Sequence, residues 1–253
     1  EDLKSIQDEL NAVRENAVHN SMLAKEAEQR KNDLIVYLAH DLKTPLTSVI
    51  GYLTLLEDEP DIPQKTREKY TSIALNKAER LEDLINEFFD ITRFNLTNIE
   101  LDIEKVNLSR MLEQICSEFI PILSEHKLSW NLDIAPDINL MCDPDKLSRV
   151  FDNLIRNAVN YSYPDTEITC VLTKQDKDIH ILIKNHGKTI SPEKLSRVFE
   201  QFFRLDSSRA SSTGGAGLGL AIAKEIVELH GGQINAASEN ESISFEVVFR
   251  NDL

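Results

Sequence analysis

Glycine is scarce in this chain of 253 residues, and it is unevenly distributed. Only Gly51 comes before residue 187, whereas four of the eight glycines fall between residues 214 and 219. Glycine permits unusual backbone conformations and close approach to a ligand, so the cluster predicts one specialised loop.

Three further shortages argue against whole classes of protein. The three cysteines, Cys116, Cys142 and Cys170, lack the spacing of a metal site or a disulfide framework, which suits a reducing compartment. Basic residues are outnumbered by acidic ones, 28 to 43, which argues against binding of nucleic acid through phosphate neutralisation. No apolar run approaches the roughly 18 residues of a membrane span, and no signal peptide opens the chain. The chain begins at Glu1 inside a helical pattern, so we expect it to be a piece of a longer protein.

The first hundred residues carry the apolar spacing of long helices. Residues 1–33 have a weak heptad seam, which fits either an ordinary amphipathic helix or a parallel coiled coil that carries a signal. Residues 34–57 and a second helix ending near Leu96 each present one apolar stripe, with a turn over residues 57–63 between them. Such a hairpin cannot cover its own apolar face, so we expect it to dimerise into a four-helix bundle.

The periodicity changes after residue 98. Helical patterns remain at residues 107–124, 144–161 and 217–230. Between and around them lie short β-type runs at residues 99–103, 127–134, 138–142, 166–173, 178–185, 232–237 and 243–249. The whole chain is therefore predicted to be α+β: a helical-hairpin domain followed by an α/β two-layer sandwich. We expect a signalling helix over residues 1–33, a dimerisation domain over 34–97 and the sandwich domain over 98–253.

His40 has three neighbours that make it a candidate nucleophile. Asp41 can accept a hydrogen bond from one ring nitrogen and leave the other to attack an electrophile. Thr44 follows one helical turn later on the same face, and Pro45 loosens the helix beside it. An exposed histidine beside a tolerated kink is the plain alternative, but it does not explain why these features coincide.

The segment HDLKTPL, which starts at His40, resembles the phosphoacceptor box of sensor histidine kinases. Later segments resemble further boxes of the same family, in the right order. Residues 152–158 resemble its N box, residues 199–204 its F box, and residues 215–220 its second glycine box. The similarity covers residues from about 34 to 249. Within the family, the sequence most resembles sensor kinases of the vancomycin-resistance type.

This resemblance implies an ATP-binding domain of the histidine-kinase and Hsp90-like type after the dimerisation and histidine phosphotransfer domain. It implies autophosphorylation of His40 from ATP and Mg²⁺, then transfer to an aspartate of a response-regulator receiver. Asp41 would act as base or orienting group, and Thr44 would position water for hydrolysis of the regulator's acyl phosphate. A homodimer is implied as well. Attachment to a bacterial inner or plasma membrane would come only through N-terminal segments absent here, with this portion in the cytoplasm.

The implied nucleotide site is spread over several segments. Asn157, on the same helix face as Asn153, is the implied Mg²⁺ ligand, because an amide oxygen is a hard neutral ligand. The glycines that precede the last helix can present backbone N–H groups to phosphate. Residues 204–213 resemble a lid whose arginines meet the γ-phosphate. The expected nucleotide-binding residues are Asn153, Asn157, Tyr161, Asn185, Gly187, Phe199, Arg204, Arg209, Gly215, Gly217, Leu218 and Gly219.

Three positions depart from the family pattern. Where the family has Asp-x-Gly-x-Gly, this chain has Asn185 and Thr189 at the first and last places. Asn185 keeps an acceptor for the adenine amino group without the charge, and Thr189 implies a backbone that needs no left-handed φ. Asn160 replaces a lysine that would meet phosphate. These departures leave open a non-catalytic dimeric regulator with a degenerate nucleotide-binding domain. An ATPase of the same fold without a phosphoacceptor is a third possibility, against which the intact phosphoacceptor box argues.

Overall fold

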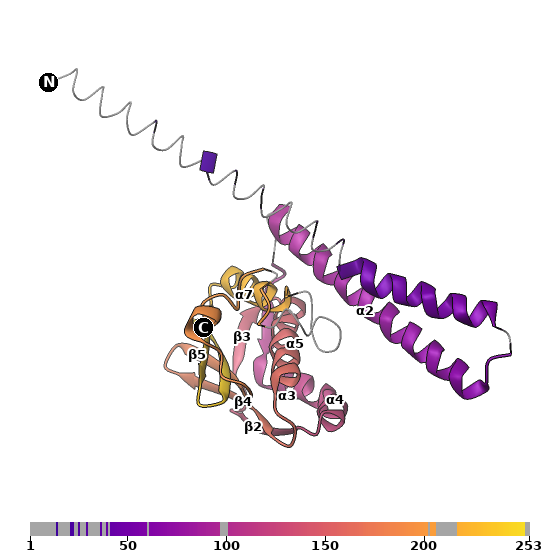
Figure 1. The fold of residues 1–253 in the computed structure, drawn as a ribbon. Coiled ribbons are helices and arrows are strands. Elements are labelled where there is room, and N and C mark those ends of the chain that lie inside the picture. The colour runs from indigo at the N-terminus through magenta and orange to yellow at the C-terminus, as the bar shows by residue number, and fades with distance from the viewer. Residues whose placement is uncertain are drawn as a thin grey trace. The chain divides into compact units, whose positions relative to one another are not determined.

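The computed structural model describes residues 41–59, 61–96, 101–201, 203–205 and 217–250, together with seven single positions before residue 40. The chain divides into two compact units, Glu1–Ile85 and Asn86–Leu253 (Figure 1). The division falls within helix α2 (Gln64–Leu96). Although α2 has 33 residues, neither it nor any other described helix is apolar enough to cross a membrane.

The described part of the first unit is a helical hairpin, as the sequence predicts. Residues 41–58 are helical, and α2 begins after a short turn. The rings of Tyr52 and Tyr70 join the two helices, with 5.4 Å between their centroids, and Ala74 and Leu84 are buried. The large apolar side chains that stay at least 37 % exposed on this hairpin include Leu46, Ile50, Leu53, Leu55, Leu75 and Ile85. A single hairpin therefore leaves much of its apolar surface uncovered.

The second unit is built on a five-stranded sheet with the order β2-β4-β5-β7-β6. Its strands are β2 (Ser129–Ile134), β4 (Glu167–Gln175), β5 (Asp178–His186), β6 (Gln233–Glu239) and β7 (Ser242–Arg250). β2 runs parallel to β4, and the other neighbours are antiparallel. A separate antiparallel pair joins β1 (Glu104–Asn107) to β3 (Asn139–Cys142).

Helices cover one face of this sheet (Figure 1). The three long ones are α3 (Leu108–Glu118), α5 (Pro144–Tyr161) and α7 (Gly219–Leu229), and α5 contacts both of the others. Along the strands burial alternates, so that Ile181 and Phe245 are buried whereas Leu182 and Glu246 are not. One sheet face thus packs under the helices, and the predicted two-layer α/β sandwich is confirmed.

Three local features differ from the sequence prediction. The helix predicted at residues 107–124 is two helices, α3 and α4 (Ile120–Glu125), because Pro121 lacks the N–H that would continue α3. Residues 101–103 of the strand predicted at residues 99–103 are not in a strand, residues 99 and 100 lie outside the described residues, and the strand β1 begins at Glu104. The helix α6 (Pro192–Leu195) was not predicted, since a single turn is too short to show a period.

Candidate functional site

The predicted phosphoacceptor segment belongs to the first helix of the hairpin. His40 lies outside the described residues, whereas Asp41 is half-buried and Thr44 is exposed. The helix continues through Pro45, whose side chain is buried, and Ser48 Oγ donates to the Thr44 carbonyl over 3.2 Å. Proline at this position removes the amide that ordinarily bonds the carbonyl four residues earlier. The backbone beside residue 40 therefore keeps its helical course with one rung of the hydrogen-bond ladder missing.

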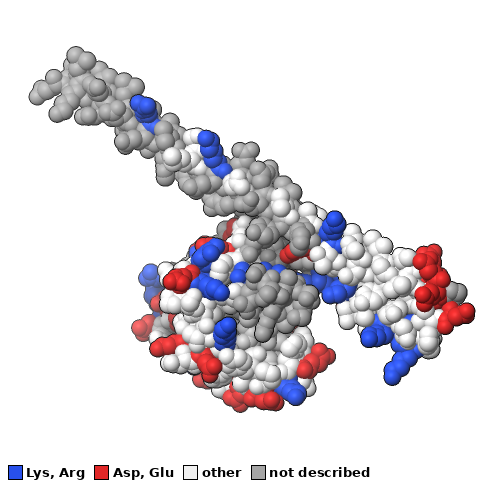
Figure 2. All heavy atoms as spheres, in the orientation of Figure 1, with Lys and Arg blue, Asp and Glu red and all other residues white. Residues whose placement is uncertain are grey.

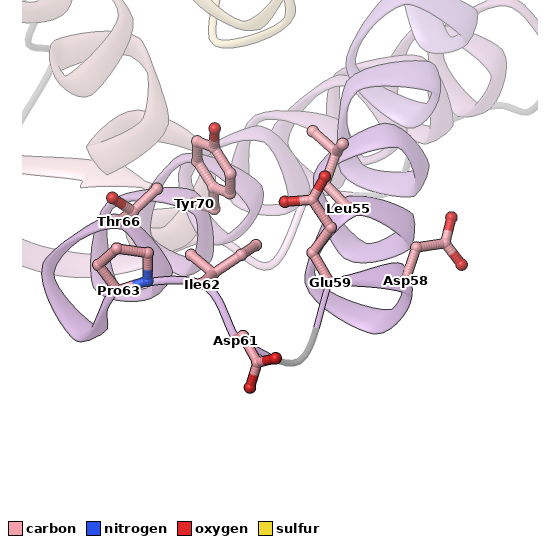
Figure 3. Close-up of a pocket in the computed structure, with 8 residues that line it drawn as sticks. All are labelled: Leu55, Asp58, Glu59, Asp61, Ile62, Pro63, Thr66 and Tyr70. Carbon is pink, nitrogen blue, oxygen red and sulfur yellow. The ribbon is translucent and has the colours of Figure 1, made fainter.

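A cavity at the hairpin turn contains none of the predicted site residues (Figure 3). Its lining comes from both helix ends and includes the carboxylates of Asp58, Glu59 and Asp61. Acidic side chains also gather at this turn in Figure 2. This cavity is therefore not the nucleotide site expected from the sequence, whose residues belong to the second unit, on and around α5.

Two amides lie on the polar side of α5. The apolar residues of this helix are buried, with Leu154 and Ala158 fully covered, while Asn153 and Asn157 are half-buried. The helix starts at a side-chain cap, because the Asp143 carboxylate accepts from the backbone N–H of Lys146 over 3.1 Å. In the described part of the chain the Asn157 side chain forms no hydrogen bond, so its amide oxygen is available to a cation such as Mg²⁺.

Asn153 lies against the start of α7. A Cβ added at Gly219 would be 2.9 Å from Asn153 Oδ1, so a larger residue there would force the Asn153 amide to move. The preceding Gly217 has a left-handed φ of 76°, which glycine adopts without strain. Leu218, the N-cap residue of α7, offers no side-chain hydrogen bond to the first turn. The first N–H groups of α7 are therefore left to another acceptor, and phosphate is a suitable one.

A second close approach occurs at the other end of α5. A Cβ added at Gly187 would overlap the Tyr161 carbonyl oxygen and lie 3.3 Å from Asn185 Nδ2. Gly187 is therefore needed for space, since its φ is not left-handed. Thr189 has no left-handed φ either, which confirms the prediction made from its identity. Asn185, at the end of β5, is only 1 % exposed.

Asn153 and Asn185 share an unusual state. Among the buried side-chain nitrogen and oxygen atoms of the described residues, those that lack a hydrogen-bond partner are Nδ2 of Asn153 and Nδ2 of Asn185. Leaving such a donor unsatisfied costs about 1–3 kcal/mol, so each one calls for an explanation. Asn153 and Tyr161, whose carbonyl borders the loop that follows Asn185, are eight residues apart on α5, a rise of about 12 Å along the helix. An extended ligand with acceptors near both ends, such as a nucleotide triphosphate, fits this arrangement.

The remaining predicted residues belong to the segment after α6. The Phe199 ring packs edge-on against Phe245, with 6.2 Å between centroids, and Lys224 Nζ lies 5.9 Å from the Phe199 centroid. Arg204 is half-exposed and forms no ion pair with any described residue. Arg209 and Gly215 lie outside the described residues.

The structure also reveals contacts of residues 185–189, the segment that corresponds to Asp-x-Gly-x-Gly, that the sequence analysis missed. Glu241 donates its backbone N–H to Thr189 Oγ1, and the carboxylate of Glu241 accepts a hydrogen bond from the Tyr163 hydroxyl over 3.3 Å. Desolvation and that carboxylate raise the pKa of Tyr163 above its usual value of 10.0. No sequence signal could have linked Thr189 to a residue 52 positions later.

Similarity to known proteins decides the family. Residues 30–96 match the His Kinase A (phospho-acceptor) domain, and residues 142–252 match the histidine kinase-, DNA gyrase B- and HSP90-like ATPase. The sensor protein VanSC of Enterococcus gallinarum is 57 % identical over 97 % of this chain and 68 % of its own length. The chain belongs to the sensor histidine kinases, in a VanS-like group.

Two further similarities agree with this assignment. The sensor protein VanS of Enterococcus faecium is 48 % identical to this kinase over 96 % of the chain and 63 % of the relative. The crystal structure of histidine kinase ThkA in complex with the response regulator protein TrrA shares the fold. Its TM-score is 0.69 at 21 % identity, over 90 % of this chain and 64 % of that one. The predicted family and fold class are confirmed, and this kinase spans about two thirds of the length of both VanS relatives.

Proposed function

We propose that this kinase transfers the γ-phosphoryl group of ATP to His40 and then to an aspartate of a response-regulator receiver domain. The pair of buried, unpartnered amides at Asn153 and Asn185 is the observation that carries the nucleotide site. Asn185 would meet the adenine base, while Asn153 and the N–H groups at the start of α7 would meet the phosphates. Tyr161 and Gly187 would border the base, and Gly215, Gly217, Leu218 and Gly219 would border the phosphates.

In the first step a ring nitrogen of neutral His40 attacks the γ-phosphorus roughly in line. The nitrogen–phosphorus bond forms as the bond from phosphorus to the bridging oxygen breaks, and ADP leaves with that electron pair. Asp41 takes the ring proton or orients the ring for attack. Arg204 and Arg209 would offset charge on the γ-phosphate, and Phe199 would support this segment from the core. Mg²⁺, when bound, offsets charge on the triphosphate, and Asn157 would supply one of its ligands.

The second step would require a dimeric kinase and a receiver partner. The exposed apolar side chains of the hairpin support a homodimer in which two hairpins form a four-helix bundle. ThkA forms a complex with the response regulator protein TrrA, which supports a partner of that kind here. In the reverse direction, Thr44 would position water for hydrolysis of the regulator's acyl phosphate. We place this portion in the cytoplasm, attached to a bacterial membrane through further segments of the full-length protein.

Incubation with γ-labelled ATP and Mg²⁺ tests this proposal against both alternatives. Label that stays on the protein in alkali but is lost in acid indicates phosphohistidine and supports the kinase. Nucleotide binding without label indicates the non-catalytic regulator. Release of labelled phosphate with no label retained at any time indicates an ATPase without a phosphoacceptor.

A further inference from the structure

The loop after β5 is tied to the β6–β7 hairpin at three points. The Gly187 N–H donates to the Glu241 carbonyl over 2.9 Å, and the Glu241 N–H donates to Thr189 Oγ1 over 2.9 Å. The Ile190 N–H donates to Ser238 Oγ over 2.9 Å. This loop therefore uses both backbone groups of one hairpin residue, and a threonine hydroxyl supplies one of the two bonds.

The hairpin turn places Glu241 where it can do this. Asn240 and Glu241 have left-handed φ values of 50° and 56°, the conformation of a two-residue turn between antiparallel strands. The next residue, Ser242, is paired with His186 at the last rung between β5 and β7. Glu241 thus lies directly beyond the point where β5 ends and the loop begins.

The end of α5 borders the same loop. The Tyr163 N–H donates to the His186 carbonyl over 2.8 Å, and the Tyr163 hydroxyl donates to the Glu241 carboxylate over 3.3 Å. The Tyr161 carbonyl leaves no room for a side chain at Gly187. The loop is held between a helix end and a hairpin turn, and little space remains for it to move.

We propose that Thr189 is a positioning residue for nucleotide binding, which acts by fixing Glu241 and through it the loop that follows Asn185. The inference rests on the proposed nucleotide site, since it concerns the segment that would carry the base. A glycine at position 189, which the family resemblance would place there, has no acceptor for the Glu241 N–H and gives the loop more freedom when no ligand is bound. Restoring that glycine should therefore weaken nucleotide binding.

Three substitutions at this position separate the hydroxyl from the side-chain volume. Thr189→Gly and Thr189→Val both remove the acceptor, and valine keeps the shape, whereas Thr189→Ser keeps the acceptor. Thr173→Val is the matched control, because Thr173 is half-buried on β4 and its side-chain hydroxyl forms no hydrogen bond with any described residue.

Calorimetric titration with a non-hydrolysable ATP analogue and Mg²⁺ supplies the first readout. We expect the Kd to rise about two- to tenfold for Thr189→Gly and Thr189→Val, the range that one lost hydrogen bond produces. Thr189→Ser and Thr173→Val should stay within about twofold of the parent, the serine because it keeps the bond. At saturating ATP the labelling rate of every variant should match the parent. Binding by Thr189→Gly or Thr189→Val as tight as the parent's would overturn the proposal, as would a serine variant that behaves like valine.

Amide hydrogen exchange at Glu241, measured by NMR without nucleotide, tests the contact separately from the site. Exchange should be faster in Thr189→Val than in the parent and in Thr189→Ser. Equal exchange in all three would refute the contact. If the parent binds no ATP analogue at all, the proposed nucleotide site fails and the positioning role fails with it, while the exchange result still shows whether the contact exists. If exchange changes but the Kd does not, Thr189 holds the loop without positioning nucleotide.

Discussion

The backbone N–H of Asp143 donates a hydrogen bond to Nε2 of His230 over 3.0 Å, which joins the start of α5 to the end of α7. A backbone N–H can only donate, so Nε2 must be unprotonated. Nδ1 then carries the proton, which it donates to the Ile226 carbonyl over 2.7 Å. This neutral ring ties together the two helices that bring Asn153 and Gly219 into contact.

Replacement of His230 by phenylalanine should lower the free energy of unfolding by about 1–3 kcal/mol, because the Asp143 N–H loses its acceptor. The aromatic ring that packs edge-on against Phe249 would be kept. Urea unfolding can be followed by the fluorescence of Trp130, the single tryptophan, which lies in the second unit. His180→Phe is the control, since this half-buried ring bonds only an exposed carboxylate, and it should cost less than about 1 kcal/mol. Equal losses in the two variants would contradict the role given to His230.

Asn157→Ala should abolish the Mg²⁺-dependent part of ATP binding while changing the stability of the free protein by less than about 0.5 kcal/mol. The side chain is half-buried and forms no hydrogen bond within the described residues, so its removal breaks no internal contact. Calorimetry with and without Mg²⁺ measures the first effect and thermal unfolding the second. Asn160 is exposed one turn later, and Asn160→Ala should change neither the Mg²⁺-dependent ATP binding nor the stability. A large loss of stability in Asn157→Ala would mark the residue as structural.

Asn185 offers a test of base recognition with changes in both directions. Asn185→Asp should bind ATP as well as the parent or up to about tenfold tighter, because a charged acceptor strengthens the hydrogen bond to the adenine amino group. It should still prefer adenine to guanine nucleotides. Asn185→Ala removes the acceptor and should bind more weakly than the parent. If alanine binds as tightly as asparagine, this side chain does not contact the base, and the degenerate-site alternative gains support.

Thr44→Ala should separate two activities. Thr44 is exposed one turn after residue 40 and has no evident part in attack on ATP, so autophosphorylation should stay within about threefold of the parent. Hydrolysis of a phosphorylated receiver domain should slow by at least about tenfold, because its water would no longer be positioned. Thr47→Ala, another exposed threonine of the same helix, should change neither rate. A parallel fall of both rates in Thr44→Ala would refute the water-positioning role.

Local patterns predicted most of the fold because they act within a few residues. The stripe of apolar residues on α5 and the alternation along β4, β5 and β7 each reflect one buried face. The predictions failed where one residue changed the local outcome, as at Pro121, or where an element was only one turn long, as in α6. The strand placed at residues 99–103 was misplaced because β1 is defined by its pairing with β3, far along the chain.

The candidate site was less predictable, since its geometry comes from distant segments. Gly187 was noticed as a glycine, but only the structure shows that the Tyr161 carbonyl is what excludes a side chain there. From the sequence, Thr189 is only a residue that replaces a glycine of the family pattern. In the structure, its hydroxyl accepts a hydrogen bond from Glu241 in the β6–β7 turn. The unpartnered amides of Asn153 and Asn185 could not be foreseen either, because the absence of a partner depends on the whole fold.

The most direct test of the central claim is labelling of His40→Gln beside the parent, with γ-labelled ATP and with binding of an ATP analogue measured on the same samples. Glutamine keeps a polar side chain of similar length but has no nucleophilic ring nitrogen. We predict that the parent acquires acid-labile label, whereas His40→Gln acquires none and binds the analogue as tightly as the parent. Acid-labile label on His40→Gln equal to that on the parent would contradict the claim that residue 40 receives the phosphoryl group.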